Sequence, residues 1–485
     1  MTIPSYPLEL SSQDMRAMVR QAMDRIAAHI ETLPQQPMHR TRGGKKLARS
    51  LREPLPERGA SFDSLLALLF NRVIPASLNT ASPGYLAYVP GGGIFHSAVA
   101  DLVTDATNRY VGVWLAAPAL VQLEANVVQW FCSMLGLPDG SGGVLTTGGS
   151  MANLIAVVTA RRERLPKDFL RGILYASSEA HHSVQKAALI AGFPPENVRE
   201  IVVDDHFRMS PSALERAVSE DRARGLEPFL VVASAGTTGT GAIDDLPTIA
   251  AFAQREKLWL HVDAAYGGFF ALTERGRTAL RGIEHADSIT LDPHKGMFLP
   301  YGTGCVLVRD QQALRRTHAV SGSYMPRMQT DDDLVDFCDL SPELSRDARG
   351  LRVWLPLKMH GASAFRDALD EKIDLARYAV DALRTMPSVE IVAEPELSLL
   401  AFRFTPPGFE GEDLDAFNRR LVQHVNAKQR VLLTGVVLRG TDTGRLEGRF
   451  VIRICILSFR THRDRIDACL EDLRASLSEM QSSGR

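Results

Sequence analysis

The chain has 485 residues, more than a single hydrophobic core usually serves, so two or three subdomains are expected. Hydrophobic residues make up 45% of it and charged residues 23%, which are ordinary values for a globular protein. The net charge of −2 provides no basic field and therefore argues against a partner that is nucleic acid or an acidic membrane surface.

The N-terminus and the cysteines indicate the compartment. The opening segment MTIPSYPLEL lacks the basic and apolar regions of a signal peptide, and no apolar run is long enough to span a bilayer. The cysteines are scattered, odd in number and without metal-ligand spacing: Cys132, Cys305, Cys338, Cys455 and Cys469. We therefore expect a cytoplasmic protein with reduced thiols and no bound metal.

An amphipathic helix is predicted near the N-terminus. Ser11, followed three residues later by Asp14, forms a capping-box pattern. Apolar residues then recur at helical spacing until Ile30, and Pro34 ends the run. A stripe of this kind could lie on a membrane surface, but it more often packs on protein. The following basic segment, Thr41 to Gly59, is broken by Gly and Pro and is predicted to be a solvated linker.

The rest of the chain divides into two patterns. From about Gly84 to about Arg377, strand-like runs alternate with helical patterns, which predicts a mostly parallel sheet with right-handed crossovers. From Tyr378 onward, two strands' worth of apolar alternation and a closing helix predict a smaller α+β domain. The expected organisation is an N-terminal helical segment (1–83), a large domain (84–377) and a small C-terminal domain (378–485).

A candidate phosphate site comes first along the large domain. The segment GGVLTTGGSMANLIAVVTARRERL predicts a strand from Val144 to Thr147, a Gly-Gly-Ser turn and an amphipathic helix. Backbone N–H groups at a helix N-terminus bind phosphate through unsatisfied donors and the helix dipole. Gly149 allows close approach of the backbone, and Ser150 can both cap the helix and donate to a phosphate. Taken alone, such a turn is usually no more than a turn.

Two further polar segments follow predicted strands. In RGILYASSEAHHSV, a strand from Ile173 to Ala176 leads into a turn with His181 and His182, and a flat imidazole can stack on a pyridine ring. In FLVVASAGTTGTGAID, a buried strand ends near Thr237 and Thr238, whose hydroxyls could reach the ring edge of a cofactor. Either feature alone is more often structural than catalytic.

Asp263 and Lys295 complete the set. LWLHVDAAYGG places Asp263 at the tip of one apolar run, and SITLDPHKG places Lys295 just after another. A lysine that forms a Schiff base and a carboxylate for a pyridinium nitrogen are the minimum apparatus for pyridoxal 5'-phosphate (PLP). Individually they could be a surface lysine and a helix cap. Their order decides the interpretation, because each polar group follows a successive strand and open α/β sheets bind ligands along that edge.

Together these motifs resemble those of the group II PLP-dependent amino-acid decarboxylases, the family of aromatic-L-amino-acid, histidine and glutamate decarboxylases. The resemblance also covers TASPGYLAYVPGG, WLAAPALVQLE, LRVWLPLKMHG and RFVIRICILSFRT, and so extends over most of the chain. It implies the large aspartate-aminotransferase-like fold of PLP enzymes (fold type I), built as a homodimer with active sites at the subunit interface.

The resemblance also implies roles for single residues. Lys295 matches the Schiff-base lysine, Asp263 the partner of the pyridinium nitrogen, and His181 rather than His182 the ring-stacking histidine. Further cofactor contacts are implied for Gly149, Ser150, Thr238, Ala265 and His294. Tyr85 and Tyr88 are the candidates for substrate contacts supplied across the interface, although both could equally be core aromatics.

The sequence departs from the family at two places. Gly296 follows Lys295, where the aromatic-amino-acid decarboxylases usually have tryptophan. A loop tyrosine of the family, which returns a proton to the substrate's α-carbon, aligns best with Phe337, and this residue has no proton to give. Tyr324 is a substitute candidate for the proton donor. Family members with phenylalanine at this position consume dioxygen and release an aldehyde, by decarboxylation coupled to oxidative deamination.

The function predicted from the sequence is therefore PLP-dependent decarboxylation of an L-amino acid to the amine and carbon dioxide. An aromatic substrate is expected only because it is frequent in the family. No contact in the sequence supports it, since Leu86 and Val89 flank Tyr88 where the aromatic-specific enzymes have bulkier residues. Phe337 leaves the aldehyde-forming reaction open as an alternative. An aminotransferase is a further alternative, since Arg453 could bind an α-carboxylate.

Overall fold

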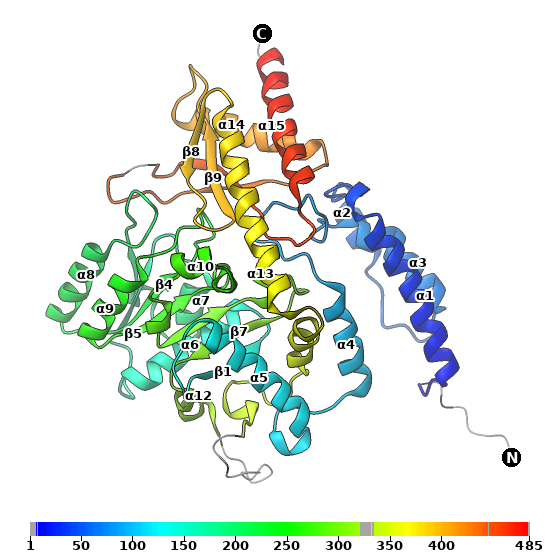
Figure 1. Cartoon of the computed structure of the whole chain (residues 1–485), viewed down its shortest axis with the longest axis horizontal. Helices are drawn as coiled ribbons and strands as arrows, with labels where there is room; N and C mark the ends of the chain where they lie inside the picture. Colours follow the sequence, from blue (N-terminus) through cyan, green and yellow to red (C-terminus); the bar gives the residue numbers. More distant parts are fainter. Residues whose placement is uncertain (1–5, 7, 321–330, 332–333, 445, 484–485) are drawn as a thin grey trace.

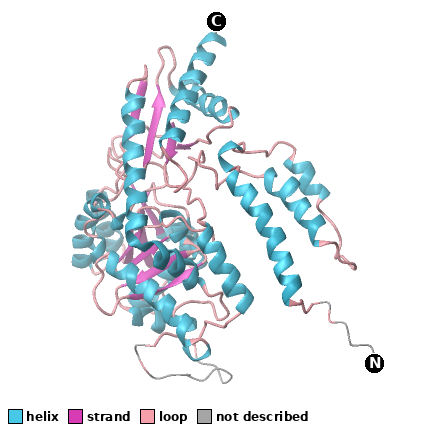
Figure 2. Ribbon diagram, turned by 45° about the vertical axis from the view of Figure 1, so that its right-hand side comes forward, coloured by secondary structure: helices cyan, strands magenta, loops and turns pink. Residues whose placement is uncertain are grey.

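The computed structural model describes residues 6, 8–320, 331, 334–444 and 446–483. It shows a large sheet with its helices, a smaller sheet packed with helices of its own, and an N-terminal helical segment that lies beside both (Figures 1 and 2). Among the described residues, we find no helix with the length and apolar character that crossing a membrane requires.

The N-terminal segment contains α1 (Ser12–Glu31), α2 (Gly44–Ser50) and α3 (Phe62–Leu68). The predicted cap of α1 is confirmed, because Ser11 Oγ accepts a hydrogen bond from the backbone N–H of Asp14 at 3.1 Å. Within the segment expected to be a linker, the structure adds the short helix α2, which has no buried residue. Helix α1 also has no buried residue in the single chain, although it carries an apolar stripe.

The large sheet has the order β1-β7-β6-β5-β4-β2-β3. Strand β7 is antiparallel to both of its neighbours, and the other pairs are parallel. The strands are β1 (Gly142–Thr146), β2 (Gly172–Ser177), β3 (Val198–Ile201), β4 (Glu227–Ser234), β5 (Trp259–Asp263), β6 (Ser288–Leu291) and β7 (Gly304–Val308). The helices of this part are α4 (Phe95–Thr107), α5 (Pro118–Met134), α6 (Gly149–Arg164), α7 (Ser183–Ile190), α8 (Pro211–Ala223), α9 (Leu246–Glu256), α10 (Glu274–Ala279), α11 (Pro293–Gly296) and α12 (Gln311–His318).

Most strands of this sheet are buried on both faces, and β3 at its edge is partly exposed. Every residue of β1, β2, β6 and β7 is buried, which explains why these segments read as continuous apolar runs rather than alternating ones. The predicted strand at 144–147 corresponds to β1 and the one at 173–176 to β2. The predicted fold class is confirmed: a mostly parallel central sheet of the fold type I kind, with a smaller α+β part after it.

The C-terminal part differs from the prediction in its number of strands. It is an antiparallel sheet of order β10-β11-β9-β8, where two strands' worth of pattern had been expected. Its elements are β8 (Val389–Ala393), β9 (Leu399–Phe404), α14 (Gly411–Ala427), β10 (Thr434–Val437), β11 (Phe450–Cys455) and α15 (Arg463–Ser483). The outer strands β8 and β10 are only partly buried, so their sequences carry a weak apolar pattern.

Two segments join the two sheets. Helix α13 (Arg349–Arg384) runs from one to the other, across the domain boundary expected at residue 377, and is kinked at Gly361 (Figure 1). The backbone N–H of Leu86 donates to Leu432 O at 3.1 Å, and the N–H of Cys455 donates to Leu86 O at 3.0 Å. The tyrosine-bearing segment around Leu86 therefore packs on the small sheet, although it precedes the large one in sequence.

Candidate active site

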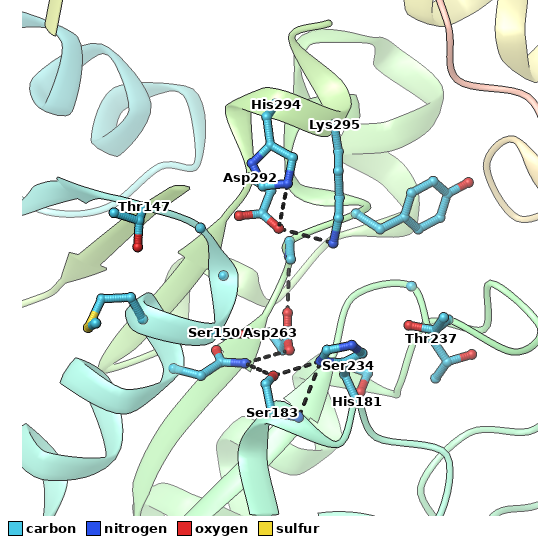
Figure 3. Close-up of a pocket in the computed structure, with 18 residues that line it drawn as sticks. Thr147, Ser150, His181, Ser183, Ser234, Thr237, Asp263, Asp292, His294 and Lys295 are labelled. Carbon is cyan, nitrogen blue, oxygen red and sulfur yellow. Dashed lines mark hydrogen bonds and ion pairs between the residues drawn. The ribbon is translucent and has the colours of Figure 1, made fainter. Parts of the chain in front are cut away.

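A cavity of about 300 Å³ lies at the carboxyl edge of the large sheet (Figure 3). Strands β1, β2, β4, β5 and β6 all end beside it, as expected for ligand binding in an open α/β sheet. Its lining includes every predicted cofactor contact: Gly149, Ser150, His181, Thr238, Asp263, Ala265, His294 and Lys295. Residues that are up to 146 positions apart in sequence thus meet in one place.

The turn between β1 and α6 is built to receive an anion. Gly148 has φ 153°, a backbone conformation that favours glycine, and no side chain caps the helix. No capping side chain therefore accepts a hydrogen bond from the first backbone N–H groups of α6, and the first turn of this helix carries no acidic residue. The expectation that Ser150 caps the helix is wrong, because Gly148 occupies the N-cap and Ser150 lies in the first turn. Its hydroxyl is thereby left for a ligand.

Asp263 is the last residue of β5 and faces the cavity. Its Oδ1 accepts the backbone N–H of Ala265 at 3.1 Å, and its Oδ2 accepts a hydrogen bond from Asn153 Nδ2 at 2.9 Å. Both carboxylate oxygens are thus held by protein donors. An oriented carboxylate of this kind can form a charge-assisted hydrogen bond with a protonated ring nitrogen.

Lys295 lies on the short helix α11, and its Nζ is 3.0 Å from Asp292 Oδ2 (Figure 3). Burial lowers the pKa of Lys295, but the neighbouring carboxylates of Asp292 and Asp263 outweigh it and the net shift is upward. The lysine is therefore an ammonium ion in this arrangement. The carboxylate of Asp292 is buried, and its Oδ1 has no hydrogen-bond partner among the described residues.

His181 is held at the start of α7. Its Nδ1 lies 2.7 Å from Ser183 Oγ, and its ring contacts that of His182 with centroids 4.2 Å apart. Burial lowers the pKa of His181, with Asp263 partly opposing this shift, so the imidazole is neutral at physiological pH. Of the two histidines, only His181 is among the residues that line the cavity.

His294, adjacent to the lysine, is fixed by a backbone contact. Its Nδ1 lies 2.6 Å from the carbonyl oxygen of Thr303 and therefore carries the proton of that hydrogen bond. The ring also packs against Tyr301, with centroids 5.6 Å apart. His294 thus presents its other edge to the cavity wall beside Lys295.

The structure does not bring Phe337 to this cavity. Its side chain is 1% exposed and belongs to an apolar cluster with Val144 and Leu340, and the guanidinium of Arg346 lies 4.6 Å from its ring centroid. Tyr324, the substitute proton donor, lies outside the described residues.

The two candidate substrate residues also lie away from the cavity of their own chain. Tyr85 is buried, whereas Tyr88 is 56% exposed, and their rings stack with centroids 6.4 Å apart. Burial raises the pKa of Tyr85, so its phenol stays protonated. Neither side chain is among the lining residues of the cavity.

Asn153, Ser183 and Asp292 line the cavity but were not predicted from the sequence. Two of them lie three positions from a predicted contact: Asn153 follows Ser150 on α6, and Asp292, the N-cap of α11, precedes Lys295. That spacing is the signal that could have found them, because residues three apart share a helix face.

The conserved domain of pyridoxal-dependent decarboxylases matches residues 45–405. The chain belongs to this family. Aromatic-L-amino-acid decarboxylase from Bacillus atrophaeus is 35% identical over 481 residues, covering 99% of this chain and 98% of that protein. The solved structure of Oryza sativa TDC with PLP and tryptamine superposes with a TM-score of 0.91 at 27% identity, covering 98% of this chain and all of the other. Rhodiola rosea 4-hydroxyphenylacetaldehyde synthase is similar too, with a TM-score of 0.88, 25% identity, and coverage of 98% and 99%.

The protein is thus a PLP-dependent amino-acid decarboxylase, and the cavity fits this cofactor. The uncapped N-terminus of α6 suits a phosphate, and Asp263 suits a ring nitrogen. Among the described residues that line the cavity, Lys295 offers the only lysine amine, and the flat ring of His181 is also part of the lining. The orphan Oδ1 of Asp292 marks a buried polar position that a bound polar group would satisfy.

Proposed function

We propose that this decarboxylase acts on an aromatic L-amino acid and releases the corresponding amine and carbon dioxide. The observation that carries the proposal is the meeting of Lys295, Asp263 and the uncapped end of α6 in one cavity. When bound, PLP supplies a conjugated ring that accepts the electrons of the bond to the departing carboxylate. The protein supplies orientation and electrostatics.

The residues divide this work. Lys295 Nζ is the amine that would hold the cofactor's aldehyde carbon. Asp292 Oδ2 lies 3.0 Å from this nitrogen and favours its protonated form. Asp263 would keep a proton on the ring nitrogen, and its fixed position costs no reorganisation during the reaction. Gly149 and Ser150, with the backbone of the α6 N-terminus, would hold the phosphate.

The aromatic substrate is supported by similar proteins: an aromatic-L-amino-acid decarboxylase is 35% identical, and the similar TDC structure contains tryptamine. In this chain, Tyr88 offers an exposed ring stacked on Tyr85. Since neither lines its own cavity, we propose that a second copy of the chain supplies them to the substrate pocket. The cytoplasmic location inferred from the sequence belongs to the same proposal.

The homodimer is supported by the N-terminal segment. Met15, Met18 and Val19 form a stripe on α1 and are 50%, 38% and 43% exposed in the single chain. A face of this kind is unfavourable in water and is satisfied when a second subunit covers it.

The alternative reactions gain no support from the geometry. Phe337 is packed under Arg346 in the core, so its lack of a phenol does not bear on the cavity as the structure describes it. Arg453, the candidate for an aminotransferase, donates from Nη2 to the carbonyl of Tyr88 at 2.9 Å and does not line the cavity. We therefore retain the amine as the product.

A product analysis tests the proposal. The PLP-loaded enzyme is incubated under air with a panel of L-amino acids, and carbon dioxide, amine, hydrogen peroxide and ammonia are measured. We expect equal amounts of carbon dioxide and amine from an aromatic amino acid. Peroxide and ammonia in step with carbon dioxide would establish the aldehyde reaction instead, and turnover of non-aromatic substrates alone would overturn the substrate class.

A further inference from the structure

A single buried amide connects the catalytic groups. Asn153, which is 1% exposed, lies on α6 and lines the cavity. Its Nδ2 donates to Asp263 Oδ2 at 2.9 Å and to Ser183 Oγ at 2.8 Å. Its Oδ1 accepts from Thr290 Oγ1 at 2.6 Å and lies 3.0 Å from His261 Nε2. All four hydrogen-bonding positions of the amide are therefore used.

The orientation of this amide follows from Asp263, because a carboxylate only accepts hydrogen bonds and the NH₂ group of Asn153 must therefore face it. The amide oxygen, which also only accepts, then faces Thr290 Oγ1 and His261 Nε2. Burial lowers the pKa of His261 to about 4, so the ring is neutral, and its one proton lies on Nε2, opposite this oxygen. His261 Nδ1 is then left to accept from Ser288 Oγ at 2.8 Å, and Ser288 Oγ accepts the indole Nε1–H of Trp259 at 2.7 Å.

The same amide also sets the state of His181. Ser183 Oγ accepts one N–H of Asn153, so its own hydrogen points to His181 Nδ1 at 2.7 Å. The backbone N–H of Ser183 also donates to this nitrogen at 3.3 Å. Nδ1 is thus an acceptor, and the proton of the neutral ring lies on Nε2.

We propose that Asn153 is a positioning residue that couples Asp263 and His181, the two groups that would contact the cofactor ring. It orients the carboxylate of Asp263 toward the ring nitrogen and, through Ser183, keeps His181 as the Nε2–H tautomer. The inference rests on the proposed function, because it assigns Asn153 a role in that same site. The contacts from Trp259 through Ser288 to His261 hold the amide of Asn153 in place, and these three residues are buried in the core.

Two substitutions separate this role from simple packing. Asn153→Leu removes every hydrogen bond at similar volume. Asn153→Asp keeps an acceptor for Thr290 and His261 but cannot donate to Asp263 while it is ionised. Because a hydrogen bond to a charged group is worth about 10–100-fold in an equilibrium or rate, we expect kcat to fall by about that factor in both variants at neutral pH. The KM for the amino acid should change little.

The distinguishing signature is a pH profile. When the new carboxyl of Asn153→Asp is protonated, it can again donate to Asp263, as in a carboxylate pair that shares one proton. The ratio of variant to wild-type kcat should therefore rise as the pH falls, whereas the Asn153→Leu ratio should stay flat. The titratable groups that face this position from the surrounding elements are His261 and Asp263 on β5, His181 before α7, and Asp292 and Lys295 after β6. They are common to both variants and to the wild type.

Two measurements do not depend on turnover. The dissociation constant for PLP should rise only slightly, because the phosphate contacts at α6 remain, while the circular dichroism of the bound cofactor's visible band should change as its ring loses a fixed partner. Asn418→Leu is the matched control. Asn418 is equally buried and also makes several hydrogen bonds, to the backbone of Phe404 and Leu414 in the small domain. The Asn418→Leu substitution should lower the melting temperature without changing the circular dichroism of the bound cofactor or the pH profile of kcat.

The outcomes are distinguishable. Wild-type enzyme that binds no PLP or releases no carbon dioxide overturns the proposed function itself. Active wild-type enzyme together with a flat Asn153→Asp ratio, or with dichroism as unchanged as in Asn418→Leu, overturns the positioning role of Asn153.

Discussion

At the scale of single residues, the lysine and its neighbouring carboxylate decide how the cofactor is captured. Only an unprotonated amine can attack an aldehyde, yet Lys295 is 3.0 Å from Asp292 and its pKa is raised. The same ion pair that stabilises the apoenzyme therefore opposes the first step of loading. Two predictions follow from this pair.

Lys295→Ala should abolish both the visible absorption of the bound cofactor and turnover, because no other lysine lines the cavity in the part of the chain that the structure describes. The measurement is borohydride reduction of the loaded wild-type enzyme, followed by mass spectrometry of its peptides. The pyridoxyl group should be found on Lys295, and a label on a different lysine would refute the assignment.

Asp292→Asn should make PLP capture easier at moderate pH. Burial alone lowers the pKa of Lys295 and Asp292 raises it, so removing the carboxylate shifts that pKa downward. An adjacent opposite charge commonly shifts a pKa by about 1–3 units. The rate of PLP association, measured by stopped-flow absorbance against pH, rises as the amine loses its proton, and its midpoint should move to lower pH by at least about one unit.

Asp221→Asn serves as the control for this shift. Its carboxylate is similarly buried but pairs with Arg199, away from the cavity. An unchanged midpoint in Asp292→Asn, matching that of the control, would show that Asp292 does not set the ionisation of the lysine.

The sequence predicted the residues that end strands but not those that act through other side chains. Asp263 and Lys295 follow apolar runs, so the topology of the sheet alone brings them to one edge. Asn153 lies within an ordinary helical pattern, and its importance depends on contacts with residues 30, 108, 110 and 137 positions away. Such contacts exist only in the folded chain.

At the scale of elements, the N-terminus of α6 is the feature that the fold dedicates to the cofactor. Gly149→Ala should weaken PLP binding, because an added Cβ would lie 3.0 Å from the Asp292 carboxylate and 3.4 Å from Ala265 Cβ. Because the 3.0 Å contact is tighter than ordinary packing, either the Asp292 carboxylate or the turn must move by a few tenths of an ångström, and a shift of the turn moves its N–H groups with it. Losing about one charge-assisted hydrogen bond raises the dissociation constant for PLP about 10-fold or more, which fluorescence titration of the apoenzyme can measure.

Gly44→Ala is the matched control for this helix end. Gly44 is the first residue of α2, as Gly149 is of α6, and a Cβ there meets nothing within 4 Å. Equal PLP affinity in the two variants would contradict a phosphate site at α6.

Strands could be predicted where burial leaves an apolar pattern in the sequence. Strands β1, β2, β6 and β7 of the large sheet are fully buried and read as apolar runs. In the small sheet, β8 and β10 are only partly buried and carry a weak apolar pattern, and the sequence predicted two strands' worth of pattern where the sheet has four strands. The placement of Phe337 depended on a loop, and no periodicity fixes where a loop side chain points. The structure packs it into the apolar cluster near Val144.

At the scale of the whole molecule, the single chain leaves its N-terminal helices without a core of their own. Helix α1 has no buried residue, and Met15, Met18 and Val19 of its apolar stripe are exposed. The sequence predicted both the helix and the apolar stripe, and the exposure of that stripe in one chain is what favours a second subunit. The stripe and the two tyrosines outside the cavity both support the proposal that the working unit contains a second copy of the chain.

The last prediction therefore tests assembly. The double substitution Met15→Glu and Met18→Glu places two charges on the α1 stripe, and burying an unpaired charge in an interface costs several kcal/mol. We expect the variant to sediment as a monomer at concentrations where the wild type is a dimer, and to lose most of its decarboxylase activity because the partner's tyrosines are withdrawn. Leu170→Glu is the control, since Leu170 is 56% exposed on the large domain and the substitution adds a charge outside the stripe. A double variant that stays dimeric and active would place the interface elsewhere, whereas a monomeric variant with full activity would show that one chain completes its own substrate pocket.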